Sequence, residues 1–410
     1  MSFNPSIPTV MHIDFNSCFA SVEQQANPFY RGRSIAVAAY SSPGGCILAA
    51  SIEAKEYGIK TGTRVGDAKK ICPKLIVLEP DPPKYRYVHK QLNKLLLGYT
   101  QHLSAKSIDE FVLHFPAQSQ ISKSYDLQSV AQQIKKQIRS EIGDHLTVSI
   151  GISTNRLLAK LASNLKKPDG LEKIDIKNFE EIYKRTKLTD LNGIGGRNAL
   201  RLQMSDIFSV WDFYQADLNK LKIAFRSVAA NYWYFRLQGY EVDDVKFARK
   251  SFGNSYAFPY HNGSLNNLFP VLHKLTQKTG SRMRSSGYQA QGVAVWLRFR
   301  SGKNWVQSKK LSDPVYESRD IYQQILSLLR QAPSEPVHIL QESVFGLLPL
   351  KIFQPELFDN SLKKRNLTYK LDEINQKWGD FAIFPAAMLP ALKVVKDRIA
   401  FGQGGIRGDF

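Results

Sequence analysis

The 410-residue sequence has few cysteines and no long apolar segment. Its three cysteines, Cys18, Cys46 and Cys72, are far apart and form no CxxC pair, which argues against a disulfide framework and a structural zinc site. No run approaches the roughly 18 apolar residues of a membrane span. The first residues, MSFNPSIPTVMHID, lack the basic and apolar regions of a signal peptide. We therefore expect a cytoplasmic protein with no membrane partner.

The chain also lacks acidic residues over one long stretch. Residues 245–312 contain no Asp or Glu but twelve Lys or Arg, and the whole chain has a formal net charge of +20. Such an excess indicates a polyanionic partner, with nucleic acid first and an acidic membrane surface second. A solvated basic face is the alternative, but the complete absence of acid favours a surface that follows phosphates.

The order of strand and helix signals predicts an α+β protein of two to four domains. In the first 170 residues, strand signals such as VMHID, SIAVAAY, LIVLEP and LTVSIGIS alternate with helix signals, one of them over residues 84–103. This layout is that of a split βαβ sheet with helices on one face. Residues 175–240 carry only helical signals. Strands return at VAVWLRFRS and VHILQESVFGL, around a helix over residues 318–332.

Three carboxylates lie at strand ends in the predicted sheet. Asp14 follows the first strand, just before a helix, and the pair Asp109 and Glu110 interrupts the strand signal AKSIDEFVLHF. Asp14 alone also fits a helix N-cap. If the strands are neighbours, the three carboxylates repel one another unless a cation neutralises them, and hard oxygen ligands suggest Mg²⁺. Because neighbouring strand residues face opposite ways, both members of the pair reach one ion only if they lie at a bend.

Five motifs occur in an order and at a spacing that resemble one protein family. They are HIDFNSCFASVE, AASIEAKEYGIKTG, SIDEFVL, SIGISTNRLLAKLASNLKKPDG and LNGIGGRNALRL. Over about residues 10–350 the chain resembles the Y-family (translesion) DNA polymerases of the bacterial polymerase IV or polymerase V catalytic type.

The resemblance implies a multidomain right-hand architecture. A split-βαβ (ferredoxin-like) palm would comprise residues 8–17 and 81–174, and small α/β fingers residues 18–80. A helical thumb would span residues 175–240, and a DNA-gripping α/β little finger residues 241–350, followed by a tail over residues 351–410.

The resemblance also implies a catalytic centre with two Mg²⁺ ions. Asp14, Asp109 and Glu110 would be their ligands, with the backbone carbonyl of Phe15 assisting. Phe19 would be the steric gate that clashes with a ribose 2′-OH, although its spacing also fits a core aromatic.

Further residues would bind the incoming nucleotide by the same resemblance. The nucleotide-binding set would comprise Asn16, Ser17, Cys18, Phe19, Lys55 and Lys167. Lys167 would neutralise charge on the triphosphate, while a solvated turn residue is its plainer interpretation. Many relatives have Tyr in place of Ile52 and Arg in place of Lys55, so a triphosphate contact at Ile52 is not expected. The helix that follows Asp14 should add N–H groups that favour phosphate.

Two glycine-rich and basic segments point to DNA contacts. LNGIGGRNALRL fits a helix-hairpin-helix, in which Gly193, Gly195 and Gly196 let backbone N–H groups reach a DNA phosphate and Arg197 and Arg201 add charge. A plain hairpin of two helices is the alternative. In the basic stretch, the expected DNA-binding residues are Arg249, Lys250, Arg298 and Arg300.

The segment KIFQPELFD carries Gln354, Leu357 and Phe358 in the pattern QxxLF. This pattern resembles the peptide by which bacterial polymerases bind the sliding clamp. A linker whose apolar residues pack on their own domain is the alternative.

Together these features predict a template-directed, low-fidelity translesion DNA polymerase that adds dNMPs to a primer 3′-OH. The small side chains of SSPGGCILAAS favour a loose lid over the new base pair. Expected partners are primer-template DNA, dNTPs and a sliding clamp, bound by a monomeric catalytic subunit of the SOS response to DNA damage. Two other functions stay open: a non-catalytic DNA-binding protein with a polymerase-like fold, and another two-metal enzyme such as a nuclease.

Overall fold

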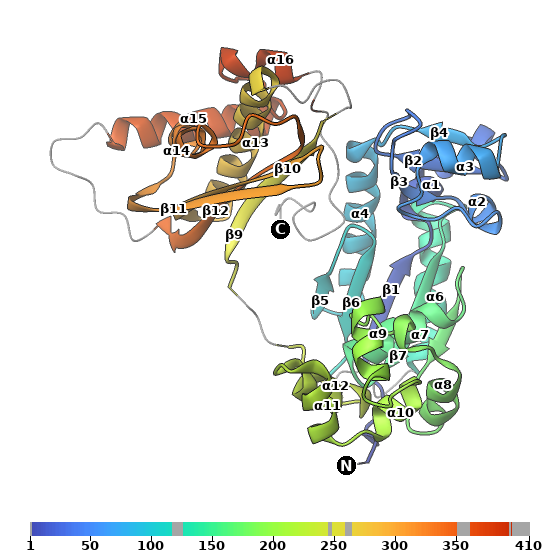
Figure 1. The fold of residues 1–410 in the computed structure, drawn as a ribbon. Coiled ribbons are helices and arrows are strands. Elements are labelled where there is room, and N and C mark those ends of the chain that lie inside the picture. The colour runs from blue at the N-terminus through green and yellow to red at the C-terminus, as the bar shows by residue number, and fades with distance from the viewer. Residues whose placement is uncertain are drawn as a thin grey trace. The chain divides into compact units, whose positions relative to one another are not determined.

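A computed structural model of the chain describes residues 2–116, 126–244, 248–258, 265–350, 361–392 and 395. The chain divides into two compact units, residues 1–245 with 398–410 and residues 246–397 (Figure 1). Each unit has its own sheets, helices and apolar core, and each is described separately.

The first unit is built around a five-stranded sheet of order β5-β6-β1-β7-β8. The strands are β1 (Val10–Phe15), β5 (Leu103–Ala105), β6 (Glu110–His114), β7 (Val148–Ser153) and β8 (Leu171–Lys173). β1 is antiparallel to both neighbours, β6 and β7. β6 and β7 therefore run in the same direction with β1 between them, which is the split βαβ arrangement that the sequence predicts.

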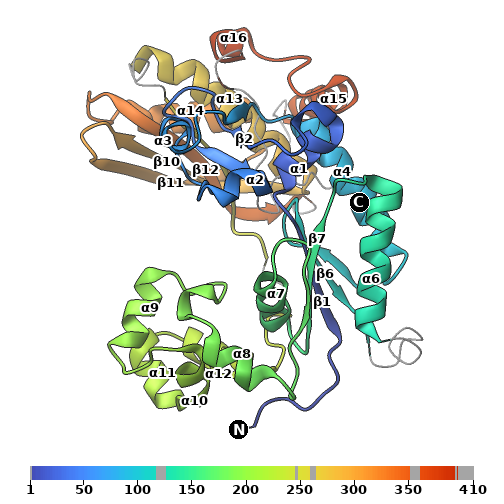
Figure 2. The same ribbon diagram turned by 90° about the vertical axis from the view of Figure 1, so that its right-hand side faces the viewer.

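Helices cover both faces of this sheet, whereas the sequence predicts helices on one face. Met11, Ile13 and Phe15 join one buried core with α4 (Pro82–Leu97), α6 (Leu127–Gln137) and η2 (Ile138–Ile142). The alternate residues of β1 face α7 (Arg156–Leu165), where Val10 packs with Ala159. Figure 2 shows α6 and α7 on opposite sides of the sheet. The helix expected over residues 84–103 ends at Leu97, and the strand β5 begins at Leu103.

Gly151 explains how α7 lies so close to the sheet. A Cβ atom at this position in β7 would lie 2.0 Å from the carbonyl oxygen of Ala159 and 2.2 Å from the amide nitrogen of Ser163. Only glycine accommodates such an approach of two backbones. The contact sets the height of α7 above the strand that carries Asp14.

Residues 18–78 form a smaller α/β layer. Its three-stranded sheet has the order β3-β2-β4, with β2 (Ile35–Ala38), β3 (Ile47–Ala50) and β4 (Ile76–Leu78). Around it lie α1 (Cys18–Ala26), η1 (Pro28–Tyr30), α2 (Ile52–Glu56) and α3 (Val65–Ile71).

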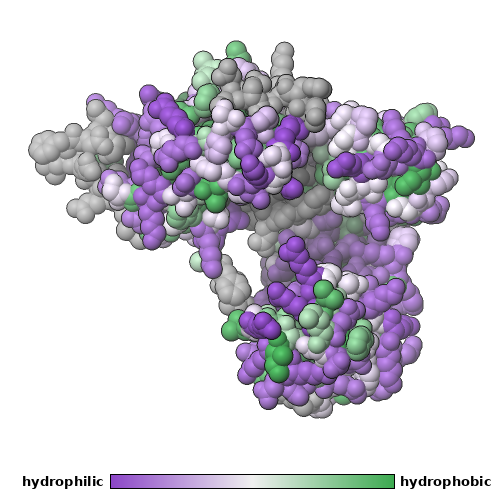
Figure 3. Space-filling view, viewed as in Figure 1, coloured by the Kyte–Doolittle hydropathy of each residue, from purple (hydrophilic) through white to green (hydrophobic). Residues whose placement is uncertain are grey.

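Residues 179–237 are helical, as the sequence predicts. The elements are α8 (Phe179–Arg185), η3 (Leu188–Asp190), α9 (Gly196–Gln203), α10 (Val210–Gln215), α11 (Leu218–Phe225) and α12 (Ala229–Leu237). They enclose an aromatic core in which the rings of Phe213 and Trp233 lie 5.5 Å apart. On the face shown in Figure 3, hydrophobic patches interrupt the largely hydrophilic surface over these helices.

The second unit is a four-stranded antiparallel sheet of order β11-β10-β12-β9. Its elements are β9 (Ser251–Ala257), α13 (Leu265–Ser285), β10 (Tyr288–Phe299), β11 (Asn304–Val315), α14 (Ser318–Leu329) and β12 (Val337–Pro349). Val293, Val295 and Leu297 of β10 pack in a core with residues of α13 and α14. The intervening residues of β10 face away from these helices.

The C-terminal segment that the structure describes packs on this second unit. It contains α15 (Ser361–Trp378), η5 (Ala386–Met388) and α16 (Leu389–Leu392). Asp372 of α15 accepts two hydrogen bonds from the buried Arg284 of α13, at 2.6 and 2.8 Å. Among the described helices, none is long and apolar enough to span a bilayer.

Candidate active site

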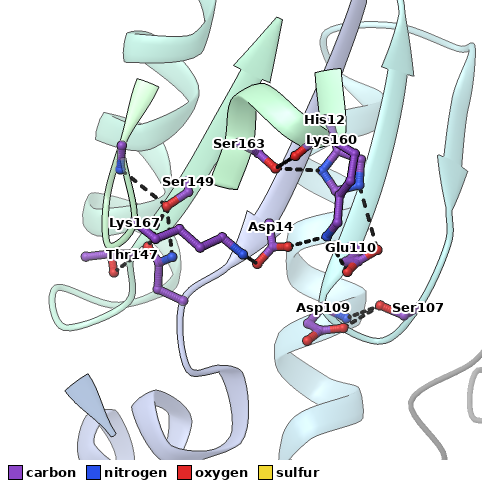
Figure 4. Close-up of polar contacts among 12 residues, drawn as sticks. His12, Asp14, Ser107, Asp109, Glu110, Thr147, Ser149, Lys160, Ser163 and Lys167 are labelled. Carbon is purple, nitrogen blue, oxygen red and sulfur yellow. Dashed lines mark hydrogen bonds and ion pairs between the residues drawn. The ribbon is translucent and has the colours of Figure 1, made fainter. Parts of the chain in front are cut away.

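Asp14 and Glu110 face each other across two neighbouring strands. They are direct partners in the antiparallel register of β1 and β6. Both side chains lie on the face of the sheet that carries α7, together with His12 (Figure 4). Asp14 belongs to the strand, and the N-cap of α1 is Ser17, so the alternative role of Asp14 as a helix cap is wrong.

Asp109 lies in the bend that the sequence predicts. The chain bends at Ile108 and Asp109, and β6 begins at Glu110. Ile108 turns into the core with 2% of its surface exposed. The Asp109 carbonyl accepts a hydrogen bond of 2.9 Å from the Phe15 amide, and its carboxylate accepts one from the Ser107 hydroxyl. The backbone of Asp109 is thereby held against the end of β1.

Two lysines neutralise this carboxylate cluster. The ammonium group of Lys160, on α7, lies 2.6 Å from Asp14 Oδ2 and 2.5 Å from Glu110 Oε1. The ammonium of Lys167, in the loop after α7, lies 2.6 Å from Asp14 Oδ1. Figure 4 shows Lys160 between Asp14 and Glu110, and Lys167 approaching Asp14 from the side of Ser149. Lys160 is not among the site residues that the sequence predicts.

The environment separates the pKa values of the two adjacent carboxyl groups. Burial acts to raise the pKa of Glu110, but the contact with His12 and the charge of Lys160 outweigh burial and lower this pKa to about 2. Burial raises the pKa of Asp109, and the nearby charges of Glu110 and Asp14 add to that effect. Burial acts to lower the pKa of Lys160, yet Asp14 and Glu110 raise it overall. Glu110 and Lys160 therefore form a charged pair.

The oxygen ligands of the cluster are chemically suited to a hard divalent cation. In this structure, however, Asp14 and Glu110 form ion pairs with lysines. Carboxylate oxygens are the ligands that Mg²⁺ prefers. Within the described part of the chain, however, no three His, Cys, Asp or Glu side chains are grouped so as to hold a metal ion. The positive charge that the cluster requires is supplied by Lys160 and Lys167.

A cleft of about 600 Å³ opens above the carboxylates. Its floor contains Asp14, Asp109 and Glu110, and its opposite wall contains Ala49, Ile52 and Lys55. The walls therefore come from the large sheet on one side and from the layer of residues 18–78 on the other.

The start of α1 also lines this cleft. Ser17 and Cys18 both belong to the lining. The Ser17 hydroxyl is buried and has no hydrogen-bond partner among the described residues. A buried donor without a partner beside free helix N–H groups is suited to receive an anion.

The other expected nucleotide-binding residues differ in their burial and in the groups that they contact. Burial lowers the pKa of Lys55, and the nearby charge of Lys167 adds to this effect. Asn16 is 4% exposed, and its side chain binds other parts of the protein. Phe19 is fully buried and stacks on Tyr85 with ring centroids 4.4 Å apart. Its packing fits a core aromatic, and its role as a gate stays a prediction.

A second cavity, of about 680 Å³, lies on the other side of Lys160. Its lining includes Glu110 and Lys160 from the carboxylate–lysine cluster and Gly193 from the predicted hairpin. It also contains Arg156, Arg201 and Arg236, of which Arg236 forms an ion pair with Asp243 of the same lining and Arg156 one with Asp244. Gly193 has φ +101, a backbone conformation that favours glycine. Gly195 is the N-cap of α9, which begins at Gly196 and continues with Arg197.

The expected DNA-binding residues of the second unit lie on different elements and differ in exposure. Arg249 and Lys250 are exposed just before β9, and Arg298 is exposed on β10. Arg300 donates a hydrogen bond of 3.1 Å to the carbonyl of Phe258. The QxxLF residues Gln354, Leu357 and Phe358 lie outside the described residues.

A signal for Lys160 is nevertheless present in the sequence. In α7 the neighbours Leu158, Ala159 and Leu161 are buried, so a lysine among them is unusual. A lysine that packs among buried residues needs an anionic partner, and the carboxylates of the preceding strands are the nearest candidates.

Comparison with protein families gives two matches. The model of the impB/mucB/samB family matches residues 13–164, and the model of the C-terminal domain of that family matches residues 249–354. The first range includes all three carboxylates and Lys160, and the second covers all four strands of the second unit's sheet.

Curated relatives and solved structures are similar over most of the chain. DNA polymerase IV of Halorhodospira halophila is 30% identical over 344 residues, which cover 83% of this chain and 95% of the relative. DNA polymerase IV 1 of Halalkalibacterium halodurans is 29% identical over 383 residues, or 90% of this chain and 91% of the relative. The Y-family DNA polymerase chimera Dbh-Dpo4(243-245)-Dbh has a TM-score of 0.71 at 23% identity and covers 83% of this chain and 99% of its own. The last likeness shows the shared fold.

Proposed function

The chain belongs to the Y-family of DNA polymerases and is a DNA-directed DNA polymerase, and we propose that it copies damaged templates by two-Mg²⁺ phosphoryl transfer. The observation that carries this proposal is the cross-strand pair Asp14 and Glu110, with Asp109 at the adjoining bend, at the floor of a cleft lined by lysines. Curated relatives of similar length are named DNA polymerase IV, which supports the same reaction.

The units would supply the parts of a right-hand polymerase. We assign the five-stranded sheet, residues 8–17 and 81–174, to the palm and residues 18–80 to the fingers. Residues 175–240 would be the thumb and residues 241–350 the little finger. The cleft between the large sheet and the layer of residues 18–78 would then receive the nascent base pair.

Asp14, Asp109 and Glu110 would hold the two Mg²⁺ ions, with the Phe15 carbonyl assisting. The bound ions would supply charge neutralisation for the attacking primer 3′-oxygen and for the triphosphate. Asp109 is the ligand least engaged in ion pairs, because its carboxylate bonds Ser107 whereas Asp14 and Glu110 bind Lys160. Lys160 would have to move away from Asp14 and Glu110 for both carboxylates to hold a cation through the oxygens that it now contacts.

Three groups around the cleft would bind the triphosphate. The ammonium of Lys167 reaches the floor of the cleft and would neutralise negative charge on the leaving pyrophosphate. Lys55 faces it from the opposite wall. The buried Ser17 hydroxyl and the first N–H groups of α1 would bind phosphate oxygens, which satisfies donors that otherwise lack partners.

Phe19 would act as the steric gate from its position in the first turn of α1. Its ring is held by stacking on Tyr85, whose hydroxyl donates a hydrogen bond of 2.8 Å to Glu23. A ring fixed in this way cannot yield to a ribose 2′-OH, so the clash would select dNTPs. On the fingers side, Ala49 and Ala50 present small side chains to the cleft, which supports loose contact with a damaged base pair.

Duplex DNA would be held by backbone and basic groups. The second cavity, with Arg156, Arg201 and Arg236, adjoins the catalytic carboxylates and would hold the primer strand. Gly193, Gly195, Gly196 and Arg197 would bind a phosphate at the hairpin. In the little finger, Arg249, Lys250, Arg298 and Arg300 would contact the DNA backbone. Gln354, Leu357 and Phe358 would bind a sliding clamp, with the chain acting as a monomeric catalytic subunit.

Primer extension by an Asp109→Asn variant tests the function. We expect incorporation to fall at least about 1,000-fold, or about 4 kcal/mol, because the substitution removes a ligand charge and keeps the side-chain size. Asp144→Asn is the matched control, since Asp144 is an exposed carboxylate paired with Arg31. Primer-template binding should stay within about threefold of the parent in both variants.

The outcomes separate the alternatives. Undiminished extension by Asp109→Asn would remove the catalytic role of Asp109, whereas no extension by the parent protein would favour a DNA-binding protein of polymerase-like shape. Shortening of a labelled primer in Mg²⁺ without dNTPs would instead indicate a nuclease. Extension past an abasic site by the parent protein tests lesion bypass in the same assay.

A further inference from the structure

The Asn16 side chain points into the protein and connects two strand ends to the loop that carries Lys167. Its amide nitrogen donates a hydrogen bond of 2.9 Å to the Ser149 hydroxyl on β7. Its amide oxygen accepts bonds of 2.8 Å from the Asp169 backbone N–H and 3.2 Å from the Thr147 hydroxyl. Asn16 directly follows β1, so the end of the catalytic strand and the Lys167 loop are joined by a buried amide.

Asp169 holds the same loop from its other side. Its carboxylate forms ion pairs with Lys135 of α6, at 2.9 Å, and with Arg139 of η2. Lys135 also donates to the Gly170 carbonyl at 3.3 Å. Asp169 has φ +56, a left-handed conformation that Asp tolerates better than most residues. The loop is therefore fixed between the end of β1 and the helix behind the sheet.

The position of this loop determines where the Lys167 ammonium can reach. Lysine has a flexible four-carbon side chain, which does little by itself to fix the position of the charge. The backbone from which it extends must supply that precision, and small displacements of a group that contacts a reacting substrate are costly. Figure 4 shows the Lys167 side chain extending from beside Ser149 and Thr147 toward Asp14.

We infer that Asn16 and Asp169 are positioning residues that hold the Lys167 ammonium where it meets the triphosphate of the incoming nucleotide. This inference rests on the proposed function of Lys167. It also gives Asn16 a different task from the direct nucleotide contact that the sequence suggests, because Ser149, Thr147 and Asp169 engage its amide.

The test is a double-mutant cycle on dNTP affinity. The full-length protein is bound to primer-template with a dideoxy-terminated primer in Mg²⁺, so that no bond forms, and the equilibrium Kd of the correct dNTP is measured. Lys167→Ala should raise this Kd about 30-fold and Asn16→Ala about 10-fold. Combining the two should raise it no further than Lys167→Ala alone, because Asn16 acts through Lys167.

Conservative variants separate positioning from folding. Asn16→Asp should keep the Kd within about threefold, because the Asp169 N–H and the hydroxyls of Thr147 and Ser149 can all donate to a carboxylate. Asp169→Asn keeps the backbone N–H and loses the ion pairs with Lys135 and Arg139, so we expect a rise of about fivefold that again disappears in the Lys167→Ala background. Asp144→Asn removes a surface ion pair elsewhere and should leave the Kd unchanged.

The outcomes distinguish the inference from the function on which it rests. If Asn16→Ala weakens dNTP binding equally with and without Lys167, Asn16 acts independently and the inference is overturned. The inference is also overturned if both Asn16→Ala and Asp169→Asn leave the Kd unchanged while Lys167→Ala raises it. If Lys167→Ala itself has no effect, the triphosphate role of Lys167 fails, and the inference fails with it.

Discussion

Glu342 is a carboxyl group completely buried in the second unit. It lies on β12 opposite Asn254 of β9, and none of its surface is exposed. The Thr279 hydroxyl donates to Oε1, whereas Oε2 has no hydrogen-bond partner among the described residues. Burial raises the pKa of Glu342 to about 7, against the opposing effect of the bonds from Thr279 and Asn254. Burial therefore favours the protonated, uncharged form of Glu342 in the folded protein.

The stability of the second unit should consequently depend on pH. The folded-state pKa of Glu342 lies above its usual value of 4.5, so between these two pH values the folded protein holds a proton that the unfolded chain releases. This proton stabilises the folded state, and the stabilisation is lost as the pH rises through about 7. We expect the free energy of unfolding to fall by up to about 3 kcal/mol between pH 4.5 and 8 on this account. Glu342→Gln should flatten the dependence in urea unfolding at several pH values.

Glu181→Gln is the matched control for this prediction, since Glu181 is exposed and forms only a surface pair with Arg185. It should keep the pH dependence of the parent. If Glu342→Gln also keeps it, Glu342 is not the group that titrates.

At the residue scale, the sequence identifies the carboxylates better than the cations. Asp14 and Glu110 can be found because strand ends in one sheet converge, and Asp109 because two adjacent acids imply a bend. The sequence indicates that Lys160 needs an anionic partner but does not place it between Asp14 and Glu110, since that depends on how closely α7 packs on β7. The inward direction of Asn16 likewise depends on Ser149 and Thr147, which are distant in sequence.

The packing of α7 on the sheet is the element-scale feature on which the site depends. α7 carries Lys160, and the loop after it carries Lys167, so the height of the helix places both ammonium groups. That height is set by the close contact of Gly151 with the backbone at Ala159 and Ser163.

Gly151→Ala should therefore damage stability and activity together. The added methyl group meets backbone atoms that cannot rotate away, so α7 must shift, and we expect a loss of about 3 kcal/mol in the free energy of unfolding. Urea unfolding measures this loss, and primer extension should fall with it. Gly44→Ala, where a Cβ meets open space, should leave the free energy of unfolding unchanged. If Gly151→Ala has the same free energy of unfolding as the parent, α7 can shift away from β7 without loss of stability, which would contradict the prediction.

Element prediction succeeds where the apolar pattern is regular and fails where it is interrupted. β1, β7 and α7 combine strong periodicity with clear ends. The strand β11 is not predicted because its segment NWVQSKKLSDPV is largely polar and exposed, as in an edge strand. The helix α13 is not predicted because Pro270 and Gly280 lie inside it, and both residues normally indicate a break.

On the scale of the whole molecule, the chain carries a large excess of positive charge. The chain carries 56 Lys and Arg against 36 Asp and Glu. In the second unit the charge lies on both sides of the sheet. Arg298 belongs to the alternate residues of β10 that face away from α13 and α14. Lys309 lies on the helical side, where its ammonium group is 3.5 Å from Gln324 of α14. Because the basic residues lie on opposite sides of the sheet, removing those of one side at a time can identify the side that faces DNA.

Removing Arg298 and Lys310 together should weaken duplex binding and its salt dependence. Lys310 pairs with Gly292 of β10, which shares the outward side with Arg298. Loss of two phosphate contacts should reduce the slope of log K against log salt by about 2. Lys309→Ala with Arg330→Ala removes equal charge on the helical side, since Arg330 is the exposed C-cap of α14. Equal effects of the two pairs would mean that net charge alone governs affinity.

Metal removal should leave the folded state intact. Lys160 and Lys167 neutralise Asp14 and Glu110 by direct ion pairs. Folding therefore does not require a divalent cation, in contrast to small domains that fold around a metal. We expect the same thermal midpoint in EDTA and in Mg²⁺, within about 1 °C, in differential scanning calorimetry of the DNA-free protein. A large upward shift in Mg²⁺ alone would contradict this neutralisation.

The lysine-bridged carboxylates also have a practical consequence for experiments on the enzyme. Under the proposed function, the protein can be purified, concentrated and stored with a chelator, which keeps contaminating metal-dependent nucleases inactive. Primer-template and dNTP can be loaded in the same buffer, and one addition of excess Mg²⁺ then starts every molecule at the same moment. Displacement of Lys160 from Asp14 and Glu110 would be the first event that such a synchronised start resolves.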